Sequence, residues 1–181
     1  MVGKGLQAEL SMTLPGIPQL EATPEILRLL LAGVTPLQTQ WKPSPERFSL
    51  AELLEHLSHV EGHYFRQAAE QMVSEDYPEI SPYDQNAYFA SGIYSDRDAE
   101  DSFDHWEEQR EENIAYLNGL KLQAADRKAR HPDLGDLTLH CILNEWAFHD
   151  LGHIRQVAEL VRAIRYYPEL GHFASQYQVH P

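Results

Sequence analysis

The last long helical segment of the chain is the feature that most constrains its fold. Residues 138–164 carry apolar side chains at helical spacing, and at about 100° per residue these fall in one stripe: Leu139, Ile142, Leu143, Trp146, Val157, Leu160 and Ile164. His149 and His153 fall on the same side, roughly 60° and 25° from the centre of the stripe. The segment therefore predicts a helix that packs into a core and carries two histidines toward it.

Three further helical segments, and no convincing strand, precede it. Thr23–Pro24 combines a favourable N-cap with proline at the first helical position, which predicts a helix over residues 23–31. Ser49 and Glu52 form a capping-box pattern at the start of a second helix, expected over 50–74. A long ordered loop at 75–96 precedes a third helix at 97–120, and a turn at 131–136 precedes the fourth. The expected fold class is all-α, a four-helix bundle with a long loop between the second and third helices.

Length and composition indicate a single globular domain. The 181 residues, 43% of them hydrophobic, suit one domain over residues 1–181, with its core at about 20–164 and a polar C-terminal tail at 165–181. The first residues lack the long apolar core of a signal peptide, and no apolar run approaches the roughly 18 residues needed to span a bilayer. Cys141 is the single cysteine, so no intramolecular disulfide can form. We therefore expect a cytoplasmic protein.

The net charge argues against two classes of partner. The formal charge is −14, and a field of that sign repels the phosphates of nucleic acids and of anionic membranes. No basic stripe offsets it. The expected partner is a small molecule, with no nucleic acid and no membrane.

Histidine is over-represented, with ten in the chain. His149 and His153 stand at positions i and i+4, so their imidazoles lie one above the other on a helix and can share a metal ion. Histidines that face a core need hydrogen bonds or a metal to offset their desolvation. A pair of hydrogen-bonded core histidines is therefore the alternative to a metal site.

The second helix offers the third candidate ligand. By the same phase count His56 is nearest the apolar stripe of that helix, roughly 90° from its centre, while His63 lies farther out and His59 farthest, at about 150°. We expect His56 to face His149 and His153 across the bundle. We expect His59 to face solvent or to support a ligand from behind. A rival set on one helix, His56 with His59 and His63, stays open, although only His59 and His63 stack well.

Three histidine ligands leave one or more coordination positions for water or substrate, which is typical of a catalytic metal site. The all-nitrogen ligand set predicts a divalent metal ion, Zn²⁺ or Ni²⁺, with Fe²⁺ and Mn²⁺ as alternatives. Asp150 is expected either to accept an N–H from a ligand imidazole or to pair with an arginine. Glu145, one turn before His149, is expected to be a base, an extra ligand or a surface carboxylate.

Three stretches of the chain resemble the DinB/YfiT-like superfamily of metal-binding four-helix proteins. Residues 41–61, WKPSPERFSLAELLEHLSHVE, are similar to its proline-containing entry loop and "HLxxxE" helix. Residues 83–94, YDQNAYFASGIY, resemble its aspartate-containing loop, and residues 131–160 resemble its "HPxLG…HDxxHxxQ" end. The chain departs from the pattern at Phe48, where many relatives have tryptophan before the capping serine. This change affects packing at the helix start and none of the candidate ligands.

The resemblance implies the same three metal ligands, His56, His149 and His153. Characterised relatives include S-transferases that use bacillithiol or related thiols and a mycothiol-dependent maleylpyruvate isomerase, and dimers are common among them. By resemblance we expect a metal-dependent thiol S-transferase, or a related enzyme that activates a thiol or water, acting as a homodimer. The alternatives are a non-catalytic metal-binding or stress-response protein and a metal-free bundle whose histidines serve packing.

Overall fold

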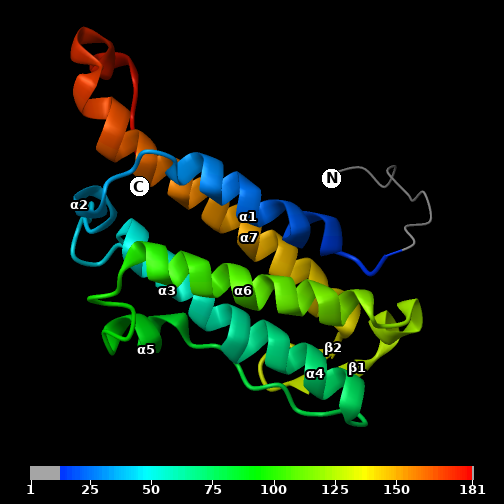
Figure 1. The fold of residues 1–181 in the computed structure, drawn as a ribbon. Helices are drawn as coiled ribbons and strands as arrows, with labels where there is room; N and C mark the ends of the chain where they lie inside the picture. Colours follow the sequence, from blue (N-terminus) through cyan, green and yellow to red (C-terminus); the bar gives the residue numbers. More distant parts are fainter. Residues whose placement is uncertain (1–12, 181) are drawn as a thin grey trace.

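A computed structural model describes residues 13–180 of the chain. Four helical rods form a bundle (Figure 1): α1 (Ile17–Leu31), α3 (Leu50–Val60) continued by the π-helical turn η1 (Glu61–Phe65) into α4 (Arg66–Ser74), α6 (Ala99–Asn118), and α7 (Leu139–Val161). The predicted all-α, four-helix architecture is confirmed. None of the described helices is long and apolar enough to cross a membrane. Most of the N-terminal stretch considered for a signal peptide lies outside the described residues.

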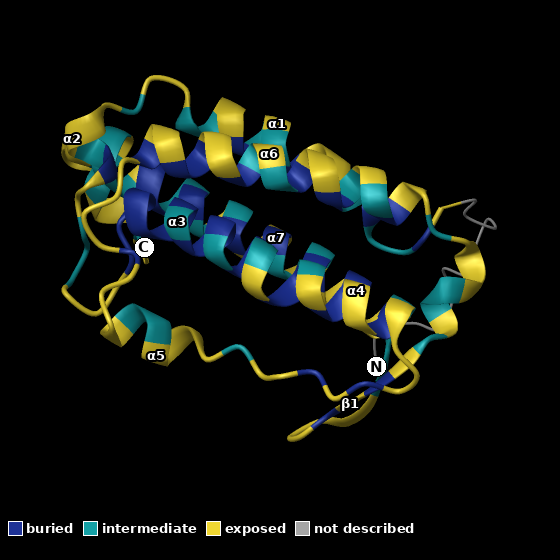
Figure 2. Cartoon of the chain, turned by 60° about the horizontal axis from the view of Figure 1, so that its bottom comes forward, coloured by how far each residue is buried: buried dark blue, intermediate teal, exposed yellow. Residues whose placement is uncertain are grey.

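The long loop between the second and third rods makes a crossover. α1 and α7 run side by side in one direction, whereas the α3–α4 rod and α6 run in the opposite direction (Figure 1). The chain leaving α4 must therefore return along the bundle before α6 begins, and residues 75–98 make this return with the short helix α5 (Gln85–Ala90) on the way (Figure 2). This connection distinguishes the topology from a simple up-and-down bundle.

Short elements complete the ends of the bundle. They are α2 (Pro36–Thr39), η2 (Leu122–Asp126), the antiparallel strands β1 (Lys128–His131) and β2 (Gly135–Thr138), and the turns η3 (Arg162–Tyr166), η4 (Tyr167–Glu169) and η5 (Gly171–Gln176). The sequence did not predict the hairpin, because strands of four residues are too short for alternation to show. The expected turn at 131–136 is its tip, where His131 pairs with Gly135.

The first helix begins earlier than the Thr23–Pro24 pattern predicts. Gly16, with φ of 79°, starts α1 so close to α7 that a Cβ there would lie 2.4 Å from the carbonyl oxygen of Leu143. Pro24 therefore falls inside the helix, where it cannot donate to the carbonyl of Leu20. Arg110 of α6 replaces the missing donor, since its Nη1 lies 3.0 Å from that carbonyl oxygen. A tertiary hydrogen bond thus lets the helix continue through proline.

The core consists of two apolar clusters that face inward from the rods (Figure 2). Trp146 belongs to one cluster and Trp106 to the other, and both donate their indole N–H to Glu61 Oε2, at 3.1 and 3.3 Å. Glu61 in turn binds Arg110, so buried charge connects the two apolar clusters. This charged layer, formed by Glu61, Arg110 and Asp150, connects η1, α6 and α7 inside the bundle.

Candidate metal centre

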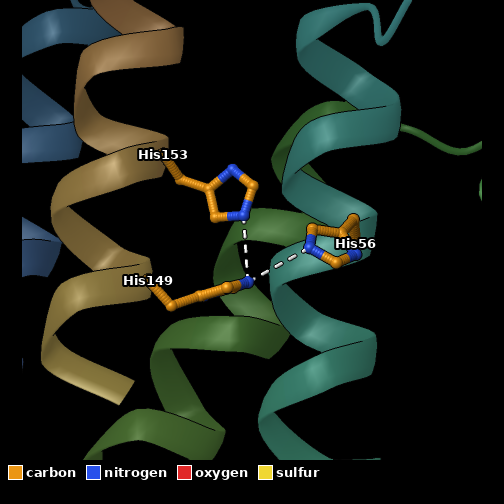
Figure 3. A group of neighbouring side chains, drawn as sticks. All are labelled: His56, His149 and His153. Atoms are coloured by element: carbon orange, nitrogen blue, oxygen red, sulfur yellow. Dashed lines mark hydrogen bonds between the residues drawn. The ribbon is translucent and has the colours of Figure 1, made fainter. Parts of the chain in front are cut away.

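Three histidines from two rods meet inside the bundle. His56 projects from α3, and His149 and His153 project from successive turns of α7 toward it (Figure 3). His56 is fully buried and His153 nearly so. One ring nitrogen from each residue lies within 4.8 Å of the others, and this is the one group of potential metal ligands of this kind within residues 13–180. The structure thus brings together the three residues that the helical phase selected.

The spacing of the nitrogens suits a shared ion. His149 Nε2 lies 3.3 Å from His56 Nε2 and 3.0 Å from His153 Nε2. Nitrogens bound to one Zn²⁺ at about 2.0–2.1 Å stand about 3.0–3.4 Å apart in four- to six-coordinate geometry. In addition, His149 Nδ1 is buried and has no hydrogen-bond partner within the described residues. A metal bound through the Nε2 atoms would leave this Nδ1 as it is, so the argument for a divalent metal rests on the separations of the Nε2 atoms.

Burial keeps the three rings neutral. Desolvation lowers the pKa of His56 to about 3 and that of His153 to about 4, and it lowers the pKa of His149 well below 6.5. Repulsion between the rings contributes to the lowered pKa of His56 and of His149. A neutral imidazole has a free lone pair, which is the form that binds a metal. The cluster is therefore ready for a cation at neutral pH without first losing protons.

A chain of hydrogen bonds fixes the orientation of His56. Its Nδ1 lies 3.4 Å from the Tyr94 hydroxyl, which lies 2.8 Å from the Tyr83 hydroxyl, which lies 2.7 Å from His59 Nδ1. Burial raises the pKa of both tyrosines, so both hydroxyls keep their protons as donors. If His56 Nδ1–H donates to Tyr94, each hydroxyl can donate to the next group, and His56 Nε2 is left as the free acceptor.

The second ligand from α7 has a support of its own. His153 Nδ1 lies 3.1 Å from Gln156 Oε1, one turn along the same helix. This contact holds the Nδ1 proton and leaves Nε2 facing His149.

A cavity of about 370 Å³ opens beside the cluster. His56 and His149 form part of its wall, together with Tyr83 from the crossover, His131 from the hairpin and Glu145 from α7. The volume is at the lower end of the range of small-molecule sites, which is about 300–1,000 Å³. His131 was not singled out from the sequence. Its Nδ1 accepts the backbone N–H groups of Asp133 and Leu134, at 3.2 and 3.3 Å, which fixes the ring against the cavity.

The sequence matches a known protein family over most of its length. The family model of the DinB superfamily matches residues 19–157, more than two thirds of the sequence. The chain belongs to the DinB superfamily. Among solved structures it is similar to YfiT from Bacillus subtilis, described as a probable metal-dependent hydrolase with an unusual four-helix bundle topology. The TM-score is 0.72 at 24% identity, over 81% of this chain and 84% of that one, and this likeness concerns the fold. A search of curated proteins found no match.

In this DinB protein Asp150 pairs with an arginine, the second of the two roles considered for it. Arg110 Nη1 and Nη2 lie 2.6 and 3.1 Å from the carboxylate oxygens of Asp150, and both side chains are 1% exposed. Burial raises the pKa of Asp150, and the charge of Arg110 opposes this. Within residues 13–180, no ring nitrogen of the three clustered histidines bonds to Asp150. Asp150 therefore anchors α7 behind the cluster.

Glu145 and His59 occupy different places around the centre. Glu145 is exposed on α7 and lines the cavity, where desolvation raises its pKa. Together with burial, its charge raises the pKa of the Tyr64 hydroxyl in the same wall to about 12. His59 is joined to His56 by hydrogen bonds through the two tyrosines, and the ring of His63 stacks on that of His59 at 4.2 Å between centroids. The rival set on the second helix is not assembled.

Proposed function

We propose that this DinB protein binds one divalent metal ion through His56, His149 and His153 and is an enzyme that activates a water or a thiol. The observation that carries the proposal is the convergence of three neutral imidazoles beside a cavity. A structural site would surround the ion with four protein ligands, whereas three leave a position open to the cavity. The nitrogen ligands favour Zn²⁺ or Ni²⁺.

A bound divalent ion would lower the pKa of a water or thiol ligand so that it is deprotonated near neutral pH. The chain's own groups would then position the substrate and accept the proton. Glu145 is the candidate base, because it lines the same cavity one turn from His149 and burial raises its pKa in the direction that favours a general base. Tyr64 beside it would orient the carboxylate.

Hydrolysis and thiol transfer are the two reactions that such a centre serves. The description of YfiT as a probable metal-dependent hydrolase supports the first, and the resemblance to thiol S-transferases supports the second. The test is to load the protein with Zn²⁺ or Ni²⁺ and to measure hydrolysis of activated esters and amides, and conjugation of an aryl halide with bacillithiol or cysteine. Turnover that needs the metal and is lost in His149→Ala supports the proposal. Stoichiometric metal with no turnover in either assay would overturn it in favour of a non-catalytic metal-binding protein.

We also propose that the protein forms a homodimer through the outer face of α7. Phe148 and Leu151 are 77% and 50% exposed there, three residues apart on one helical face. Adjacent exposed apolar side chains of this size favour a covering partner. Light scattering is expected to give twice the chain mass, and Phe148→Glu to give the monomer. A monomeric wild type would contradict this proposal without affecting the metal site.

The proposed location is the cytoplasm. The single cysteine, Cys141, is exposed and unpaired, as is usual in a reducing compartment. Fractionation of expressing cells tests this directly, and recovery of the protein outside the cytoplasm would contradict it.

A further inference from the structure

A second cavity, of about 360 Å³, is lined by residues that contact two of the clustered histidines. Phe48 in its wall stacks on His56 at 5.5 Å between ring centroids, and Gln156 in its wall contacts His153. Gln85, at the start of α5, borders both this cavity and the one beside His149. A ligand of modest length could therefore occupy both cavities and pass the metal ligands.

Two arginines supply positive charge in the wall of this second cavity. Arg47, before α3, and Arg155, on α7, are both exposed in its wall, and neither side chain makes an ion pair or hydrogen bond with any described residue. Two carboxylates share the wall. Glu159 is paired through Oε1 with Arg162, which lies outside the cavity wall, while its Oε2 is buried with no partner within residues 13–180, and Glu46 is exposed. Two cationic groups thus remain available, with forked donors suited to an oxyanion.

Gly152 supplies an independent reason to expect a ligand here. It lies within α7, where glycine is among the least favourable residues. Its φ is not in the left-handed region, and a Cβ added to it would have no atom within 4 Å. Neither backbone conformation nor packing therefore requires glycine. Gly152 lines the cavity about one turn before Arg155 on α7, and the space left by its missing side chain lets a ligand approach the helix backbone.

We propose that this cavity is a subsite for an oxyanionic group, a carboxylate or a phosphate, bound by Arg47 and Arg155 over Gly152. The inference deepens the proposed function: the substrate would be a small anionic molecule with its reactive part at the histidine cluster and its oxyanion in the subsite. Gln156 would link the two, because its Oε1 faces His153 while its amide N–H groups remain available to the cavity.

The test is an NMR titration of the metal-free protein, kept in chelator, with succinate and separately with inorganic phosphate at constant ionic strength. The arginine side-chain N–H signals and the Gly152 amide are followed. We expect saturable shifts for Arg47, Arg155 and Gly152. Loss of one charge-assisted contact lowers affinity by about tenfold or more, so Arg155→Gln should weaken binding to that degree. Arg97→Gln is the matched control, since it removes an exposed arginine paired with Glu55 and outside the cavity wall.

Two substitutions of Gly152 provide a second test, one through stability and the other through anion binding. Gly152→Ala should raise Tm by about 2–4 °C, because alanine favours the helix and meets no neighbour. Gly152→Leu should fill the subsite and abolish the anion-dependent shifts. Tighter binding of succinate would assign a carboxylate, and tighter binding of phosphate would assign a phosphate. Absence of saturable shifts in the wild type, or equal affinity in Arg155→Gln, would overturn the proposal. Because no metal is present, that result would leave the proposed metal-dependent activity untouched.

Discussion

Arg110 should be the most costly single charge to remove from this protein. It is 1% exposed and sits between two carboxylates, Glu61 and Asp150, that are equally buried. Its guanidinium makes two contacts to each of them, at 2.6–3.1 Å, and a fifth to the carbonyl of Leu20. Arg110→Met preserves the bulk of the side chain and leaves both carboxylates without their counter-ion. Removing one partner from a buried ion pair costs about 3–5 kcal/mol.

For a domain of this size that loss corresponds to a fall in Tm of about 6–20 °C. The assay is urea unfolding followed by circular dichroism, in chelator so that metal binding does not contribute. The pH dependence gives a second check. Burial raises the pKa of Asp150 above its usual 3.8, and Arg110 opposes this, so the variant should raise it further. A carboxyl group whose pKa is raised in the folded protein contributes stability that is fully present below its unfolded pKa of 3.8. This contribution is lost as the pH rises through the folded-state pKa. The deficit of the variant should therefore be larger at pH about 7 than at pH about 4, close to the unfolded-state pKa of Asp150.

A neutral version of the same layer is the control. The triple variant Arg110→Met, Glu61→Gln, Asp150→Asn removes all three charges at similar volume, and buried ion pairs replaced in this way often cost little. We expect it to recover most of the stability lost in the single variant. A single variant within about 1 kcal/mol of the wild type, or a triple variant no better than the single one, would refute the reasoning.

Three further predictions concern the centre itself. Tyr94→Phe removes the hydroxyl that faces His56 Nδ1 and should weaken Zn²⁺ affinity about tenfold in chelator competition. Tyr88→Phe is the control, because Tyr88 lies in the same segment but has no hydrogen bond to the chain of hydroxyls, and it should not weaken the affinity. Equal affinities in the two variants would contradict the role of the hydroxyl chain in orienting His56. Glu145→Gln should lower kcat about a hundredfold or more at unchanged metal content, and an unaffected kcat would exclude Glu145 as the base. The metal-free protein should lose stability as pH falls below about 6.5, by up to about 1.4 kcal/mol per pH unit for each buried histidine. The cause is that the rings take up protons first in the unfolded chain, since the pKa in the folded protein is about 3 for His56 and about 4 for His153. Flat stability between pH about 6.5 and 5 in urea titrations would show that the rings are not buried neutral.

The sequence predicted the parts of this fold that depend on local signals. Ser49 and Glu52 form the predicted capping box at 3.1 and 2.9 Å, and the rod they begin reaches Ser74 as expected. The predicted start of α1 was wrong, because a hydrogen bond from Arg110 compensates for Pro24 inside the helix. This tertiary contact leaves no signal in the local sequence.

The site residues on regular helices could also be predicted from local signals, whereas those that depend on tertiary contacts could not. Helical phase was enough to select His56, His149 and His153, because each sits on a regular helix whose apolar stripe fixes its direction. Tyr83 and Tyr94 were missed as partners of the histidines, since they lie in a crossover without periodicity and meet only when it folds back on the bundle. Arg110 was missed for a related reason: the exposed faces of α6 are rich in acidic residues, and its buried arginine does not interrupt any local pattern.

The central claim is that His56, His149 and His153 bind one divalent ion, and elemental analysis tests it most directly. The protein would be purified without an affinity tag or added metal, beside a His149→Ala/His153→Ala variant whose helical content is checked by circular dichroism. We predict about one Zn or Ni per chain in the wild type and loss of that metal in the folded variant. A wild type that is metal-free and also fails to take up Zn²⁺ or Ni²⁺, or a variant that retains its metal, would contradict the account.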